Sequence, residues 1–195
     1  MRSLFISIQS EFYKSRKTLA FWAAILLPVI ICGLIALGFY ANSDDVLKQK
    51  WPPVMLWIRL ASASMGVMGM LILPFYVIFM AFSVNNIEHK NDTWKTLFAQ
   101  PLNKFSIYAA KYLYGVILIA ISLILFPLLT YLSGFLLDLL VTGFKFGEVS
   151  PAAMLRAFYI KLFFASIGIY SIQFMLSLLW SDFLKPMGVG FVGTI

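Results

Sequence analysis

The hydrophobic residues of this chain are gathered into long runs that contain almost no charged residues. A helix needs roughly 20 apolar residues to cross a bilayer about 30 Å thick. Four runs reach this length, at residues 19–41, 60–84, 107–137 and 162–181, and the one charged residue among them is Lys111. The pattern predicts an all-α, polytopic membrane protein with four full transmembrane helices, organised as one transmembrane domain over residues 1–195.

A fifth apolar run begins at Pro186, and the sequence ends at Ile195. A stretch of this length is too short to cross a bilayer. We therefore expect only the start of a fifth transmembrane helix here, and an incomplete C-terminal end.

The segment before the first run, residues 1–18, is predicted to be an interfacial helix on the cytoplasmic side. Apolar residues within 2–17 recur at helical spacing, at Leu4, Phe5, Ile8 and Phe12. Polar residues are assigned to the rest of the helix surface, namely Gln9, Glu11, Lys14 and Arg16. A helix of this kind lies in the headgroup plane with its apolar face toward the lipid.

The second polar segment, residues 85–106, is predicted to contain a short cytoplasmic helix. Asp92 is placed to cap it, and Pro101 to end it. Trp94, Leu97 and Phe98 follow the spacing of one helix face. An exposed apolar face of this kind needs a partner protein or the membrane surface to cover it.

Composition and charge support a membrane protein. Hydrophobic residues make up 62% of the chain and charged residues only 12%, which excludes an ordinary soluble domain and a nucleic-acid binder with a basic surface. The net charge is +7. Because Lys and Arg are in greater excess in the N-terminal segment and in residues 85–111 than in the other loops, the positive-inside rule places both in the cytoplasm.

Candidate chemistry is sparse. Ionisable residues do not occur deep in any predicted span, which argues against ion-coupled transport. Gln173, the most polar residue of the fourth span, is expected to form an interhelical hydrogen bond or to line a substrate pathway. The sequence contains neither a phosphate-binding G-x-x-x-x-G-K-[ST] motif nor a metal-ligating cluster, so we expect no ATPase activity and no metal site in this chain.

Two short motifs resemble the permease subunits of type-2 ABC exporters. The first is a Glu-x-x-Lys element in an N-terminal "elbow" helix, here Glu11 and Lys14. The second is a loop of the form Glu…Thr-x-Lys-x-Leu…Pro-Leu-x-Lys…Ala-Lys after the second span, here Glu88, Thr93, Lys95, Leu97, Pro101, Leu102, Lys104, Ala110 and Lys111. The resemblance extends over the whole chain in the order of elements. The small permeases of lantibiotic immunity and bacitracin-like resistance are near this size.

The resemblance implies a multi-pass cell-membrane protein with six spans, a cytoplasmic N-terminus and two permease copies, or a paired homologue, per transporter. ATP and Mg²⁺ would bind a separate ATP-binding subunit, and an amphipathic or peptide-like substrate would be exported. The 85–106 loop would insert its coupling helix into that subunit. The expected contact residues are Glu88, Asp92, Thr93, Trp94, Lys95, Leu97, Phe98 and Pro101.

Two other functions remain open. The chain is alternatively a membrane anchor that recruits a partner through residues 85–104 without transport. It is also compatible with a membrane enzyme that uses carboxylates of the outer loops, at Asp44, Asp45, Asp138 and Glu148. These carboxylates have no accompanying nucleophile and base, so the permease is the preferred interpretation.

Overall fold

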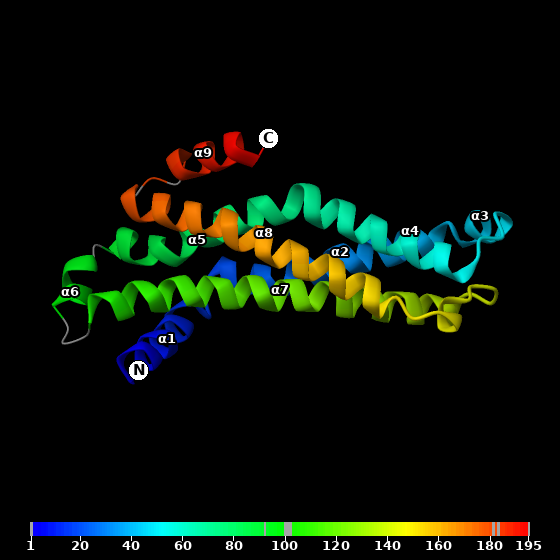
Figure 1. Cartoon of the computed structure of the whole chain (residues 1–195), viewed down its shortest axis with the longest axis horizontal. Coiled ribbons are helices and arrows are strands. Elements are labelled where there is room, and N and C mark those ends of the chain that lie inside the picture. The colour runs from blue at the N-terminus through cyan, green and yellow to red at the C-terminus, as the bar shows by residue number, and fades with distance from the viewer. Residues whose placement is uncertain (1, 92, 100–102, 181, 183, 195) are drawn as a thin grey trace. The chain divides into compact units, whose positions relative to one another are not determined.

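The computed structural model describes residues 2–91, 93–99, 103–180, 182 and 184–194. Apart from an isolated bridge between Thr142 and Phe144, its regular elements are helical, which confirms the all-α class. Figure 1 shows them in chain order: α1 (Arg2–Ser15), α2 (Leu19–Ala41), α3 (Ser43–Lys48), α4 (Pro53–Gly66), the π-helix η1 (Val67–Ile72), α5 (Leu73–Asn91), α6 (Trp94–Phe98), α7 (Lys104–Leu140), the 3₁₀-helix η2 (Phe146–Glu148), α8 (Ala152–Leu179) and α9 (Leu184–Thr194).

Three of these helices, α2, α7 and α8, are long and apolar enough to cross a membrane. A fourth span exists if α4 and α5 are counted as one helix broken at η1. The first predicted span has the observed bounds of α2. The second was predicted as one uninterrupted helix, whereas the structure places a π-helical segment in its middle, a common site of local rearrangement in membrane helices. The fourth begins ten residues earlier than predicted, at Ala152.

The described chain divides into two compact units. The first unit contains the residues up to Ala24, Leu73–Ala120 and the residues from Phe164 onward. The second contains Ile25–Ile72 and Ile121–Phe163. Helices α2, α7 and α8 contribute residues to both units, whereas α1, α5, α6 and α9 belong entirely to the first.

The core of the second unit is built around Trp57 of α4. Its indole N–H donates to the backbone oxygen of Phe146 at 2.9 Å, and its ring stacks on Tyr131. Asp138 holds the following loop by accepting from the backbone N–H groups of Phe146 and Gly147, at 3.0 and 3.1 Å. Asp138, predicted to lie in an outer loop, is thus in α7, and its hydrogen bonds give it a role in the fold.

The first unit joins its helices through polar groups as well as apolar packing. Asn85 of α5 donates to the Ser177 hydroxyl of α8 at 2.7 Å. Between α7 and α8, the ring of Tyr170 lies so close to Gly115 that a side chain at position 115 would collide with it. Buried hydrogen bonds and small residues are the usual means by which membrane helices associate, because lipid supplies little hydrophobic drive between them.

A glycine pair tests the packing of the second unit. A methyl group at Gly134 would collide with the Trp57 ring, whereas a methyl group at Gly38 meets no atom within 4 Å. We expect Gly134→Ala to lower the free energy of unfolding in mild detergent by about 1–3 kcal/mol through overpacking. Gly38→Ala, the matched control, should be neutral or stabilising by up to about 1 kcal/mol. Equal free energies of unfolding for the two variants would contradict the close contact between Gly134 and Trp57.

Candidate functional site

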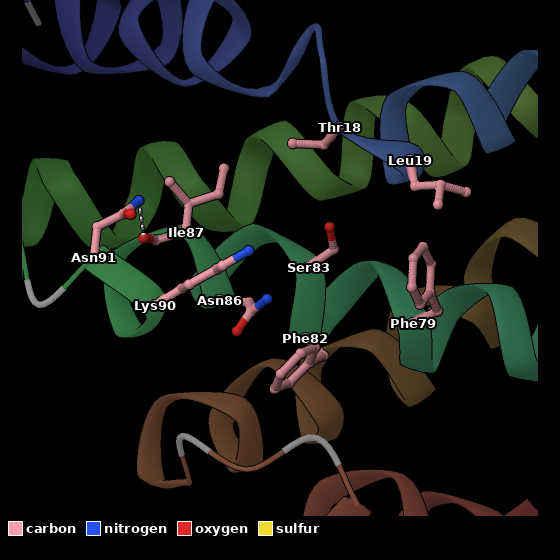
Figure 2. Close-up of a pocket in the computed structure, with 9 residues that line it drawn as sticks. All are labelled: Thr18, Leu19, Phe79, Phe82, Ser83, Asn86, Ile87, Lys90 and Asn91. Atoms are coloured by element: carbon pink, nitrogen blue, oxygen red, sulfur yellow. Dashed lines mark hydrogen bonds between the residues drawn. The ribbon is translucent and has the colours of Figure 1, made fainter.

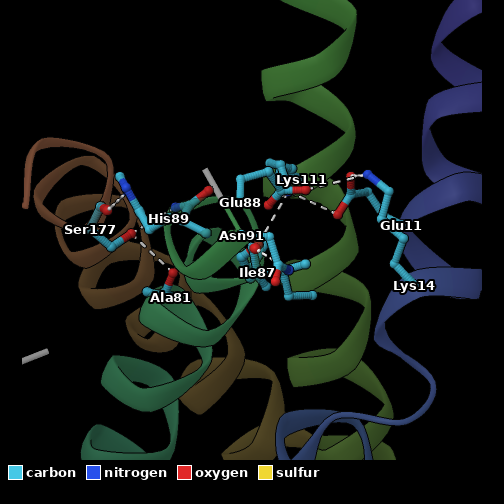
Figure 3. A network of polar contacts seen from close by, with 11 residues as sticks. Glu11, Lys14, Ala81, Ile87, Glu88, His89, Asn91, Lys111 and Ser177 are labelled. Carbon is cyan, nitrogen blue, oxygen red and sulfur yellow. Dashed lines mark hydrogen bonds and ion pairs between the residues drawn. The ribbon is translucent and has the colours of Figure 1, made fainter. Parts of the chain in front are cut away.

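Four charged side chains, three of them buried and one half-buried, form a cluster where α1, α5 and α7 meet in the first unit (Figure 3). At its centre is Lys111 of α7, which is 0% exposed. Its ammonium group donates to Glu11 at 3.1 Å, to Glu88 at 2.5 Å and to the backbone oxygen of Val84 at 3.2 Å. An ammonium group has three N–H donors, so each donor has an acceptor.

Lys14 completes the cluster from the same helix as Glu11. Its ammonium group lies 3.3 Å from a carboxylate oxygen of Glu11 and 3.3 Å from one of Glu88. Two ammonium groups thus balance two carboxylates, and both carboxylates bridge the two lysines. Such balance is required because an unpaired charge inside a protein costs several kcal/mol. We call Glu11, Lys14, Glu88 and Lys111 the charge cluster.

The pKa of Lys14 reflects this arrangement. Burial acts to lower the pKa of its ammonium group, but the carboxylates of Glu11 and Glu88 outweigh that effect and hold the pKa above its usual value. A raised pKa means that the stabilisation is fully present below the unfolded-state value and disappears only as the pH rises through the folded-state value. The ammonium group of Lys14 is therefore charged throughout the neutral range.

The charge cluster places Glu11 on the side of α1 that packs against the protein. Glu11 was assigned with the other polar residues to the helix surface outside the apolar face, whereas the structure buries it together with Ser7 and Ser15, four residues away on either side. Phe5 and Tyr13 are each 69% exposed instead. Glu11 faces the protein because Lys111 requires a carboxylate there, whereas Gln9 and Arg16 are exposed. A helix is present where the sequence predicts one, and its contact with lipid stays a prediction.

Helix α6 lies between the end of α5 and the start of α7 (Figure 1). The Trp94 ring stacks on Phe98 and on Tyr108 of α7, with centroids 5.6 and 6.1 Å apart. It also lies 5.7 Å from the Lys111 ammonium group, a cation–π distance. The predicted exposed face of Trp94, Leu97 and Phe98 is therefore half-buried. Trp94 and Phe98 point toward the protein because both rings pack against the ring of Tyr108 in α7.

The other side of α6 is open to solvent. Its exposed residues, with the residue before the helix and the one after it, are Thr93, Lys95, Thr96 and Ala99. Beside them a pocket of about 310 Å³ is lined by Thr96 and Leu97 of α6 and reaches Lys14 and Glu88 of the charge cluster. The predicted helix thus presents a polar surface and an adjoining pocket rather than an apolar face.

The remaining predicted site residues have mixed placements. Glu88 is 2% exposed and lies in α5, so it belongs to the charge cluster and not to the surface of α6. Thr93 precedes α6, and its side chain makes no capping hydrogen bond. Asp92 and Pro101 lie outside the described residues. Lys104 begins α7, with its ammonium group 5.8 Å from the Phe98 ring centroid.

Gln173 is buried between α8 and α9. With its amide oriented to satisfy both of its groups, it donates to the backbone oxygen of Pro186 at 2.9 Å and accepts from the N–H of Gly190 at 3.2 Å. The interhelical hydrogen bond expected for this residue is therefore available in the structure. A place in a substrate pathway stays a prediction.

His89 is a contact residue that the predicted set of contact residues does not include. Its Nε2 lies 3.2 Å from the backbone oxygen of Ser177, and its ring meets Trp94 edge-on at 5.6 Å. It connects α5 to both α6 and α8. The sequence held one usable signal, since His89 follows Asn85 by four residues and so lies on the same helix face. In the described part of the chain, His, Cys, Asp and Glu do not form a group of three that would hold a metal ion.

These features define a helical integral membrane protein. Its short helix α6 has an exposed polar side and packs against the buried charge cluster through Trp94. A family model described as ABC-2 family transporter protein matches residues 7–195. The chain therefore belongs to the ABC-2 transporter family and is a membrane-embedded permease subunit, which implies a separate ABC ATP-binding subunit as its partner. Neither a curated protein nor a solved structure matches the chain.

The charge cluster predicts a large effect for the loss of its central cation. Lys111→Met should lower the free energy of unfolding by about 3–5 kcal/mol, because it leaves two buried carboxylates with one lysine between them. Lys145→Met removes a cation of similar size from an exposed pair with Glu148 and should cost less than about 1 kcal/mol. Denaturant unfolding of the purified chains in mild detergent measures both. If Lys111→Met lowered the free energy of unfolding no more than Lys145→Met does, the ion pairs of Lys111 would not stabilise the fold as stated.

Proposed function

We propose that this permease subunit receives the movement of its ATP-binding partner through the exposed side of α6. The observation that carries the proposal is the position of α6, a short helix that joins two membrane-embedded helices and whose polar side is open. The contact surface would consist of Thr93, Lys95, Thr96 and Leu97. The pocket beside Thr96 and Leu97 is large enough to admit a side chain of the partner as far as Lys14 and Glu88.

Trp94, Phe98 and Glu88 take a different role in this proposal. They hold α6 to the protein, because Trp94 packs on Tyr108 and lies beside Lys111, and Glu88 pairs with Lys111. A displacement of α6 would be passed through these contacts to α5, α7 and α1 together. Direct contact of Asp92 and Pro101 with the partner is supported by the family resemblance alone.

The remaining assignments extend the same proposal. ATP and Mg²⁺ would bind the partner subunit, and two permease copies, or this chain and a homologue, would form the pathway. The N-terminus and α6 would face the cytoplasm, as the distribution of Lys and Arg indicates. The transported molecule would be amphipathic or peptide-like and would leave the cell, since the spans offer mainly apolar and aromatic walls.

Affinity purification from the native membrane in mild detergent tests the contact surface. Lys95→Glu should reduce the amount of co-purified ATP-binding subunit about tenfold, the effect of roughly 1.4 kcal/mol. Lys185→Glu is the matched control, because Lys185 is also exposed but lies in the first turn of α9. Substitution of Trp94 is less suitable, since that residue is packed inward.

Three outcomes are distinct. Loss of the ATP-binding subunit with Lys95→Glu alone supports the proposal. Equal retention by both variants would contradict the role of α6. A stable complex that contains no ATP-binding subunit, even with the unaltered chain, would favour a membrane anchor that recruits another protein.

A further inference from the structure

A second hollow in the first unit lies beside α5. It measures about 570 Å³ and is lined by one face of α5 together with Thr18 and Leu19 at the start of α2 (Figure 2). The lining residues of α5 recur at helical spacing, at Phe79, Phe82, Ser83, Asn86, Ile87, Lys90 and Asn91. The hollow is thus a groove that runs along this helix.

The polarity of the groove changes steadily along its length. Phe79 and Phe82 line one end, Ser83 and Asn86 follow, and Lys90 lies at the other end, in the last turn of α5. At 1.5 Å per residue, Phe79 and Lys90 are about 16 Å apart along the axis, close to the thickness of one hydrocarbon leaflet. An apolar end and a cationic end at this separation match a phospholipid that stands with its tail toward the membrane interior.

The polar end contains donors suited to a phosphate group. In Figure 2 the side chain of Lys90 extends along α5 in the direction of Ser83. The hydroxyl of Thr18 donates to Ser15, and the amide of Asn91 donates to Ile87, so both groups are already used. No ion pair of Lys90 is present within the described ranges. An ammonium group in that position favours an anion.

We infer that this groove binds one anionic phospholipid of the leaflet in which α6 lies. The phosphate contacts the ammonium group of Lys90, with Asn86 and Ser83 as further donors, and an acyl chain follows Phe82, Phe79 and Leu19. Leu19 is 76% exposed, as expected of a side chain that meets lipid. A protein helix in the groove fits less well, because its apolar surface would remove the Lys90 ammonium group from water without supplying an anion. The site requires only that the chain is embedded in a membrane, and it does not depend on the ATP-binding partner.

Native mass spectrometry of the full chain in mild detergent tests the inference, with phosphatidylglycerol and phosphatidylcholine of identical acyl chains as probes. The unaltered chain should retain one phosphatidylglycerol about fivefold better than phosphatidylcholine, the effect of one lysine at a membrane surface. Lys90→Gln should abolish this preference. Lys185→Gln removes an exposed cation outside the groove and should preserve it.

The space inside the groove is tested separately. Ser83→Phe should fill the middle of the groove and lower retention of both lipids, and Asn86→Phe replaces it if that variant does not fold. An unchanged preference in Lys90→Gln would overturn the inference. Displacement of phosphatidylglycerol by millimolar glycerol phosphate would overturn it too, since it would show an anion site without acyl recognition. A change of oligomeric state in Ser83→Phe, with lipid retention unaltered, would assign the groove to a second copy of the chain.

Discussion

The first unit of this protein depends on the burial of one charge, the ammonium group of Lys111. A lysine with no exposed surface in an apolar helix is tolerated only if its donors and its charge are satisfied nearby. Glu11 and Glu88 supply the charge and Val84 supplies a backbone acceptor. Since Glu11 lies in α1 and Glu88 lies in the last turns of α5, this single requirement fixes both helices against α7.

The position of α6 follows from the same requirement. The last turn of α5 carries Glu88 and His89, and the first turns of α7 carry Tyr108 and Lys111. Trp94 contacts His89, Tyr108 and Lys111 together, so the short helix between α5 and α7 is seated on residues that the charge cluster has already placed. Its polar side then remains for a partner. The proposed function needs such a connection, because force that a partner applied to a loosely tethered helix would be lost before it reached the membrane-embedded segments.

The sequence predicts most of the long helices. It does not predict which residues of different helices contact one another. Apolar runs locate α2 with its observed bounds, because bilayer thickness and helix rise together dictate length. They do not reveal η1, since a π-helical segment in the middle of a span leaves the apolar pattern unchanged. They also miss the true start of α8, where Arg156 and Lys161 interrupt the apolar run although the helix continues through them.

The candidate site is predicted in part for a similar reason. The Glu-x-x-Lys pair of α1 and the segment with Glu88 and Lys111 can each be recognised in the sequence. Neither motif indicates that Glu11 pairs with Lys111 or that Lys14 pairs with Glu88. Helical spacing shows that Trp94 and Phe98 share a face of α6. It cannot show whether that face points to a partner or to the protein, because an aromatic surface suits both. The aromatic side chain of Tyr108 and the cation of Lys111 decide the matter, and they lie in another helix.

A double-mutant cycle between Glu11 and Lys111 tests the central claim most directly, since these residues join α1 to α7 and are 100 positions apart in the sequence. The cycle compares the free energies of unfolding of Glu11→Gln, Lys111→Met and the double variant with that of the unaltered chain in mild detergent. The account predicts a coupling energy of about 1–3 kcal/mol, with the double variant more stable than the sum of the single effects allows. Additive effects, with a coupling energy near zero, would show that α1 is not held to α7 by this charge pair.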